Sequence, residues 1–184
     1  MPKDLVIRAM GGDHDAFSQL AAASIGRLYA VARLILREPE LAEDAVQEAL
    51  VAAWRDLPAL RDPDRFEAWL HRLLVRSCYR EARRSRRIGR IEVQVTPLDL
   101  GRPDESRLIA DRDQLERGFR RLDPEQRSIL VLHFFSGNTL VEIAETLQIP
   151  TGTVKSRLHR AIQSMRADLD AEARSSARSE GRLA

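Results

Sequence analysis

Side chains able to bind nucleic acid are concentrated in residues 153–160, TVKSRLHR. Lysine and arginine donate hydrogen bonds to phosphate oxygens and purine edges, and hydroxyl groups donate to phosphates. In a helix, Val154, Leu158 and Ile162 would share one inner face because residues four positions apart lie one above the other. The outward residues would then be Lys155, Ser156, His159, Arg160 and Gln163. This pattern favours nucleic-acid binding, although an ordinary solvated helix face has a similar composition.

A second group of cations lies in residues 72–90, which contain eight arginines and a single acidic residue, Glu81. Steps of three and four place most of them along one face of a helix. This arginine stripe consists of Arg72, Arg76, Arg80, Arg83, Arg84 and Arg87. A solvated face is the simpler interpretation of any such stripe. Because so many like charges would repel one another without an anionic partner, however, the stripe favours contact with nucleic acid.

Acidic residues dominate residues 38–50, which contain no basic residue, although the whole chain has a formal net charge of +2. Asp44, Gln47 and Glu48 stand at positions i, i+3 and i+4, so a helix would place them on one face. Such a face suits basic residues of a partner protein, and it also occurs on ordinary solvated helices. The uneven charge distribution therefore suggests two partners of opposite sign.

Composition limits the class of protein. The 184 residues, 43% of them hydrophobic, can bury one modest core or two small ones. The single cysteine, Cys78, excludes an intrachain disulfide and a cysteine-based zinc site, and we expect it to be an inert, half-buried helix residue. No apolar run approaches the eighteen or so residues of a membrane span, and the first residues lack a signal-peptide pattern. We expect a cytoplasmic protein without membrane insertion, metal or other cofactor.

Apolar residues recur at steps of three and four along most of the chain, which predicts an all-α fold. The first helices are expected over residues 13–37, 39–57 and 65–87, with Trp69 packed in the core. Residues 88–111 contain prolines and glycines without a helical period, which predicts a flexible linker.

The second helical block contains two N-terminal capping patterns, Asp123 with Gln126 and Thr139 with Glu142. Pro150 separates the second of these helices from a last helix expected to run from about Thr151 to Leu169. A short helix, a turn of about three residues and a second amphipathic helix form a helix-turn-helix, whose second helix can enter the major groove of DNA. A polar tail is expected over residues 170–184.

Four segments also carry a family resemblance. The first half of the chain contains GDHDAFSQL at 12–20, AEDAVQEALVAAW at 42–54 and FEAWLHRLLVRSCYREARRSRR at 66–87. The second half contains LDPEQRSILVLHFFSGNTLVEIAETLQIPTGTVKSRLHRA at 122–161. Together they resemble the extracytoplasmic-function group of bacterial sigma factors. The resemblance implies two small helical domains: region two over residues 1–87 and a region-four helix-turn-helix over 112–169.

The resemblance implies a function in transcription initiation. A member of this group binds core RNA polymerase and directs it to a promoter, where region two recognises the minus-ten element and region four the minus-thirty-five element. The acidic helix of the family docks on the clamp helices of the largest polymerase subunit, and the matching residues here are Asp44, Gln47, Glu48 and Val51. The family commonly has an anti-sigma factor as a further partner.

The resemblance also implies two sets of DNA-binding residues. The minus-ten set combines a loop that takes a flipped base with a helix that holds the single strand: Asp62, Asp64, Arg65, Arg76, Arg80, Arg83 and Arg84. The minus-thirty-five set lies on the second helix of the helix-turn-helix: Thr153, Lys155, Ser156, Arg157, His159 and Arg160. Many members carry Asn and Asp where this chain has Arg76 and Arg80, so the base preference at these positions does not transfer.

Two other classes of function are open from the residues alone. An enzyme or metal site could use Asp13, His14 and Asp15, or Asp44 with Glu48. Neighbouring helical residues face different ways, however, no further ligand or nucleophile pattern accompanies them, and Asp13 fits a helix N-cap. A self-sufficient DNA-binding regulator would explain residues 122–166 but would leave the acidic face and the arginine stripe without roles.

Overall fold

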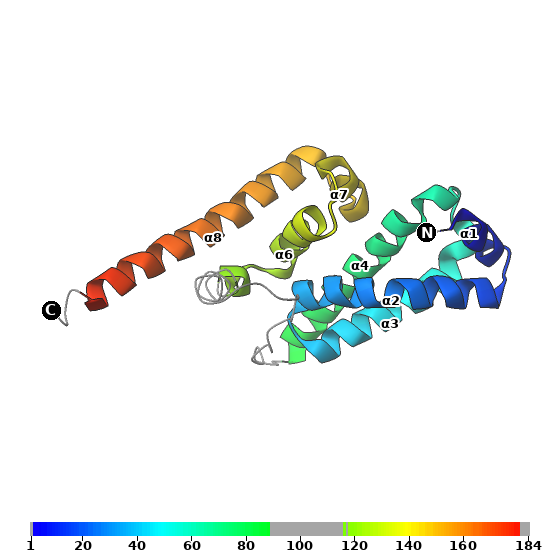
Figure 1. Cartoon of the computed structure of the whole chain (residues 1–184), viewed down its shortest axis with the longest axis horizontal. Helices are drawn as coiled ribbons and strands as arrows, with labels where there is room; N and C mark the ends of the chain where they lie inside the picture. Colours follow the sequence, from blue (N-terminus) through cyan, green and yellow to red (C-terminus); the bar gives the residue numbers. More distant parts are fainter. Residues whose placement is uncertain (1, 89–115, 117, 181–184) are drawn as a thin grey trace, which may run out of the picture.

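The computed structural model of the protein describes residues 2–88, 116 and 118–180, with side chains described through residues 87 and 167. All regular secondary structure within these residues is helical (Figure 1), which confirms the expected all-α class. Apart from residue 88, the predicted linker over 88–111 lies outside the described residues.

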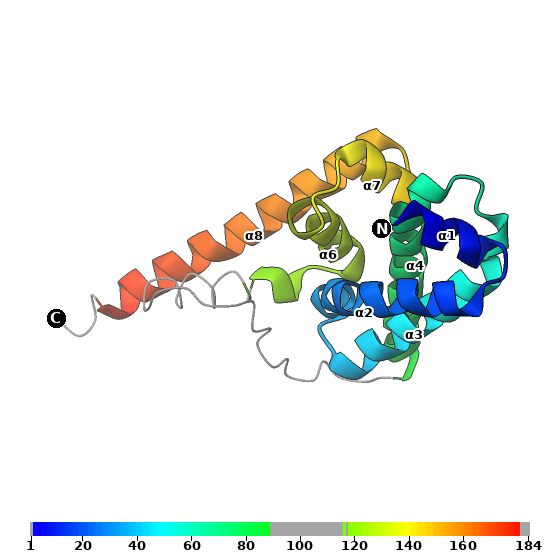
Figure 2. The ribbon, with the colours of Figure 1, turned by 45° about the vertical axis from the view of Figure 1, so that its right-hand side comes forward.

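The first module contains four α-helices and two short 3-10 turns. They are α1 (Lys3–Met10), α2 (His14–Leu36), α3 (Pro39–Asp56), η1 (Leu57–Ala59), η2 (Pro63–Arg65) and α4 (Phe66–Ile88). Helix α4 packs against α3 and α2, while α1 packs against α2 and the two turns (Figure 2). The turns and α1 therefore form one end of the module.

Local signals in the sequence set the bounds of these helices. Asp13 caps α2 by accepting a hydrogen bond from the Ala16 N–H at 3.0 Å, as expected for an N-cap residue. Arg37 ends the same helix in the left-handed conformation, with φ of 67°. Three of the helices follow the sequence prediction within one or two residues. Helix α1 was not predicted, and its Pro2 N-cap offers no side-chain cap.

The second module is built from α6 (Pro124–Leu130), the π-helical turn η3 (Val131–Phe135), α7 (Leu140–Leu147) and α8 (Thr151–Glu180). Both predicted capping boxes are present, at Asp123 with Gln126 and at Thr139 with Glu142. Gln148 ends α7 in the left-handed conformation, with φ of 55°, and thereby turns the chain toward α8. The predicted helix-turn-helix is confirmed.

Helix α8 is longer than the sequence predicted. Its backbone stays helical to Glu180, whereas the prediction placed the helix end near Leu169 and a polar tail from residue 170. In both ribbon views the C-terminal part of α8 projects away from the other described helices (Figures 1 and 2).

The two modules dock on each other and share one hydrophobic core. Buried residues Leu28 and Leu74 of the first module belong to the same cluster as Ile129, Leu132 and Ile143 of the second. The contacts join α2 to α6 and η3, and α4 to α6 and α7. Burying a Leu or Ile side chain contributes about 1.5–3 kcal/mol, so this shared core favours the docked arrangement.

Two expectations about individual elements need correction. Helix α2 is long and apolar enough to cross a membrane by length and composition alone, although no such run was expected. This is weak evidence for a span, because an interior helix passes the same test and α2 buries Leu20, Leu28 and Ile35 in the core. Cys78 is fully buried rather than half-buried, and burial raises the pKa of its thiol to about 12.

Candidate nucleic-acid and protein interfaces

The second helix of the helix-turn-helix, the N-terminal part of α8, has two distinct faces. Val154 and Ala161 are fully buried, and Leu158 is half-buried against the core. This packing fixes the rotation of the helix about its axis. The opposite face carries exposed residues in the predicted orientation: Lys155, Ser156, His159, Arg160 and Gln163.

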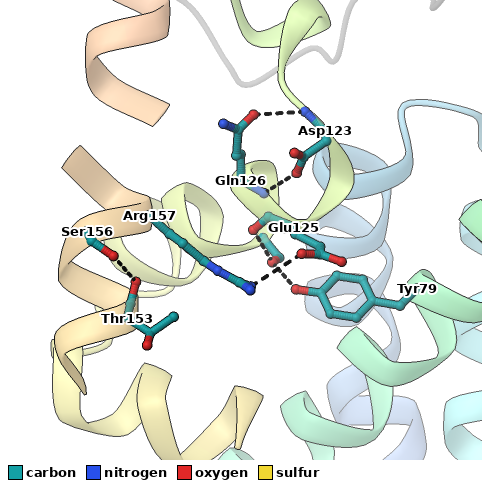
Figure 3. Close-up of polar contacts among 8 residues, drawn as sticks. Tyr79, Asp123, Glu125, Gln126, Thr153, Ser156 and Arg157 are labelled. Carbon is teal, nitrogen blue, oxygen red and sulfur yellow. Dashed lines mark hydrogen bonds and ion pairs between the residues drawn. The ribbon is translucent and has the colours of Figure 1, made fainter. Parts of the chain in front are cut away.

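Arg157 differs from its neighbours on α8. Its Nη1 lies 3.3 Å from Oε2 of Glu125, so the side chain extends toward α6 (Figure 3). Ser156, in contrast, is exposed, and its hydroxyl donates to the Thr153 carbonyl at 3.0 Å. Arg157 therefore ties α8 to α6 in this conformation and does not join the outward cations.

The arginines of α4 have partners that the sequence did not reveal. Arg80 donates through Nη2 to Glu48 of α3 and to Ser77, each at 2.9 Å. Arg76 donates to the side-chain oxygen of Gln148, at the C-terminal end of α7. Two arginines of the stripe thus have partners on other helices, and one of these partners, Glu48, is anionic.

The remaining stripe residues differ in exposure. Arg72 is half-buried. The exposed members are Arg83, Arg84 and Arg87. Arg84 lies 4.0 Å from Glu81, whose side chain is almost fully buried. Burial raises the pKa of Glu81, and the nearby Glu48 carboxylate raises it further.

The loop before α4 contains the other predicted minus-ten residues. Oδ1 of Asp62 accepts a hydrogen bond from the Asp64 N–H at 3.0 Å and so caps η2. Asp64 pairs with Lys3 of α1, whose Nζ lies 2.6 Å from Oδ2. Arg65 forms an ion pair with Glu145 of α7. The structure thus connects this loop to α1 on one side and to the second module on the other.

Lys3 is a residue of this region that sequence reasoning missed. Helix α1 buries Val6 and Ala9 against the first module, which places Lys3 beside the loop. A short helix without a side-chain cap gives little sequence signal. The partner of Lys3 lies sixty-one positions away, so no local pattern could have indicated the ion pair.

The predicted protein-binding face on α3 is present on the surface. Asp44 and Gln47 are exposed, and Val51 is 63% exposed, which is unusual for a large apolar side chain. Glu48 is half-buried and pairs with Arg80. These four residues lie along one side of α3, and Glu48 connects that side to the arginine stripe.

The alternative catalytic or metal sites receive no support from the described residues. Asp13 serves as the N-cap of α2 and also accepts from Arg8 at 2.9 Å. The ring of His14 packs against Trp54 in a tilted arrangement, with centroids 4.4 Å apart. Within the described part of the chain, no group of three or more His, Cys, Asp or Glu residues is placed to hold a metal ion.

Two family models match the chain in the order of its modules. Sigma-70 region 2 matches residues 20–88, and Sigma-70 region 4 matches residues 118–167. Helix α1 and the last part of α8 lie outside these matches.

Similar proteins carry related descriptions. The ECF RNA polymerase sigma factor SigM of Mycobacterium tuberculosis is 32% identical over 160 residues, covering 86% of this chain and 79% of SigM. SigW of Bacillus subtilis, also an ECF RNA polymerase sigma factor, is 25% identical over 182 residues, covering 92% and 97% of the two chains. The solved structure of CnrH in complex with the cytosolic domain of CnrY is 29% identical, with a TM-score of 0.64 and coverage of 92% and 97%.

Proposed function

The chain belongs to the extracytoplasmic-function group of bacterial sigma factors, and from that premise we propose how its surfaces divide the work of promoter recognition. It binds core RNA polymerase and directs promoter-specific initiation through minus-ten and minus-thirty-five elements. It is a cytoplasmic transcription factor, and sigma factors are not enzymes. We assign region two to residues 1–87, the linker to 88–111 and region four to 112–169.

The minus-thirty-five reader is the N-terminal part of α8. A recognition helix places its N-terminal residues against base edges in the major groove, and its exposed cations also reach phosphates. Lys155, His159 and Arg160 are suited to these contacts because the buried face of α8 turns them outward. Thr153 and Ser156 add hydroxyl groups near the start of the helix. Arg157 acts mainly by holding α8 against Glu125.

The minus-ten reader combines the loop of η2 with α4. Asp62, Asp64 and Arg65 belong to the loop that takes an unstacked base, and α4 supplies the cations that hold the single strand. These cations are Arg76, Arg80, Arg83 and Arg84. Holding an unstacked base favours melted DNA, because the unstacking cost of a few kcal/mol is offset only in the open state.

The polymerase-binding surface is the exposed side of α3, with Asp44, Gln47, Glu48 and Val51. An apolar side chain flanked by carboxylates suits a partner surface that combines basic and apolar groups. The exposed fraction of Val51, 63%, supports this assignment, since the core does not use this side chain.

Further partners follow from relatives. CnrH has been solved with the cytosolic domain of CnrY, and a sigma factor of Bartonella quintana has been solved with the anti-sigma factor NepR. We infer that this chain also binds an anti-sigma factor, and that it associates with the nucleoid only as part of the holoenzyme.

One experiment separates this function from that of a self-sufficient regulator. Transcripts started by the reconstituted holoenzyme on genomic DNA would first locate its promoters. A gel shift on such a promoter is then run with the free chain, with core polymerase and with both together. We expect a sequence-specific complex only when both are present. Specific binding by the free chain at physiological salt would instead support the regulator.

A further inference from the structure

Helix α7 of region four lies against the minus-ten surface of region two. Arg65 of the loop pairs with Glu145, and Arg76 of α4 donates to Gln148. Both acceptors come from one end of α7, and both donors belong to the residues assigned to minus-ten DNA. A carboxylate and an amide oxygen therefore occupy hydrogen-bonding positions of these cations that DNA would otherwise use.

Buried contacts support the same docking. Ile143 of α7 is fully buried in the core that the two modules share. Between α4 and α6, the Tyr79 hydroxyl lies 2.6 Å from the Ser128 hydroxyl. Ser128 donates its own proton to the Glu125 carbonyl at 2.8 Å, so Tyr79 is the donor. Burial raises the pKa of Tyr79 to about 12, which keeps this proton in place.

We propose that the minus-ten surface is also a protein-binding surface, whose occupant in the free chain is the α7 helix of the same chain. This proposal rests on the assignment of Arg65 and Arg76 to minus-ten DNA. DNA and α7 then compete for the same two cations, so the free chain is closed and α7 must leave before the single strand is held. The exposed Arg83 and Arg84 still permit weak contact with nucleic acid.

Covalent connection makes modest contacts sufficient for this closed state. Two partners joined by a short chain meet at an effective concentration on the order of millimolar. The Arg65–Glu145 pair is partly exposed, with 58% and 45% of the side-chain surfaces accessible, so solvent screens it. This ion pair therefore adds little to the docking, and core polymerase would separate the modules mainly against the buried contacts of the shared core.

The test uses the full free chain in two opening variants. Glu145→Gln combined with Gln148→Ala removes the charge of the first acceptor and the whole polar group of the second, and Tyr79→Phe removes the donor to Ser128 without changing charge. Glu43→Gln is the control for the lost carboxylate, because Glu43 is exposed on α3 and forms no hydrogen bond or ion pair with a stripe residue among the described residues. Small-angle scattering reports opening, and circular dichroism verifies that each variant remains folded.

The binding probe is a fluorescent twelve-nucleotide single strand, with the non-template sequence of a minus-ten element mapped with the holoenzyme. We expect a larger radius of gyration and at least about tenfold tighter binding for the double variant, and a smaller change in the same direction for Tyr79→Phe. The proposal would be overturned if both opening variants had the same radius of gyration and the same affinity for the single strand as Glu43→Gln. Opening without a gain in affinity would also overturn it, since α7 would then mask nothing.

A measurement on the holoenzyme tests separately whether Arg65 and Arg76 bind minus-ten DNA, which the masking proposal assumes. Arg65→Ala with Arg76→Ala is assayed for open-complex formation, where core polymerase holds the modules. Loss of open complexes with no masking in the free chain would leave the minus-ten assignment intact and reject the internal partner. Normal open complexes would reject the assignment and, with it, the proposal.

Discussion

The two surfaces proposed to bind promoter DNA differ in what their cations contact. In region two, Arg65, Arg76 and Arg80 each have a partner within the chain, from α7 or α3. In region four, Lys155 and Arg160 are exposed, and no hydrogen bond or ion pair to another described residue engages them. Under the proposed assignments, part of the minus-ten surface is thus occupied in the free chain, whereas the minus-thirty-five helix is exposed to solvent.

This difference suggests that the two readers become available in different ways. A duplex element exists before polymerase opens the DNA, whereas a melted strand exists only afterwards. Because Arg80 is bonded to Glu48 of the polymerase-binding face, a change at that face can reach the minus-ten surface through a single hydrogen bond. Polymerase binding therefore offers a route to release region two.

The largest expected effect is loss of core-polymerase binding, because recognition of both promoter elements depends on it. Asp44→Lys combined with Glu48→Lys should weaken core-polymerase binding at least about tenfold, because two attractive charges become repulsive. Transcription should fall accordingly, while circular dichroism shows an intact fold. Glu43→Lys is the matched control on the same helix. Asp44→Lys alone separates polymerase binding from the Arg80 bond, and wild-type affinity in the double variant would reject this surface.

The next prediction tests whether polymerase sets the distance between the two proposed DNA-binding surfaces. Changing the promoter spacer by two base pairs moves one element by about 7 Å and roughly a fifth of a turn, so run-off transcription should fall sharply. Adding a few Gly-Ser residues to the protein linker should matter much less, since doubling a flexible loop costs only about 0.6 kcal/mol. If run-off transcription tolerated spacer changes but was lost when the protein linker was extended, the linker itself would set the distance.

A smaller effect sharpens the assignment within region four. Arg160→Ala should relax base preference at one upstream position by about 1–3 kcal/mol if it reads a base, or weaken all sequences alike if it binds phosphate. Arg157→Ala should leave the base preference unchanged and lower thermal stability slightly, because it removes the Glu125 pair. Footprints of both holoenzymes on one promoter library provide the comparison. A specificity change in Arg157→Ala alone would reverse the two roles.

The smallest effect concerns the far side of the minus-ten loop. Lys3→Ala removes the ion pair with Asp64, and because both side chains are largely exposed, minus-ten discrimination should change less than about threefold. A change well above this range would make α1 a major determinant of loop geometry.

The sequence predicted what local patterns can encode. Asp123 with Gln126 and Thr139 with Glu142 marked two helix starts, and the spacing of Val154, Leu158 and Ala161 oriented the recognition helix. The ion pairs of the arginine stripe could not be predicted, because Glu145 lies eighty positions from Arg65 and meets it only through tertiary docking. The inward position of Arg157 likewise depends on Glu125, thirty-two positions earlier.

The most direct test of the function maps transcription starts on genomic DNA with reconstituted holoenzyme containing the wild-type chain, Arg160→Ala or Arg76→Ala. The account predicts two short motifs upstream of the wild-type starts at a nearly constant separation. Arg160→Ala should alter dependence on the upstream motif alone, and Arg76→Ala dependence on the downstream motif alone. Starts without a shared pair of motifs, or one variant that alters both motifs equally, would contradict the division of promoter reading between the two modules.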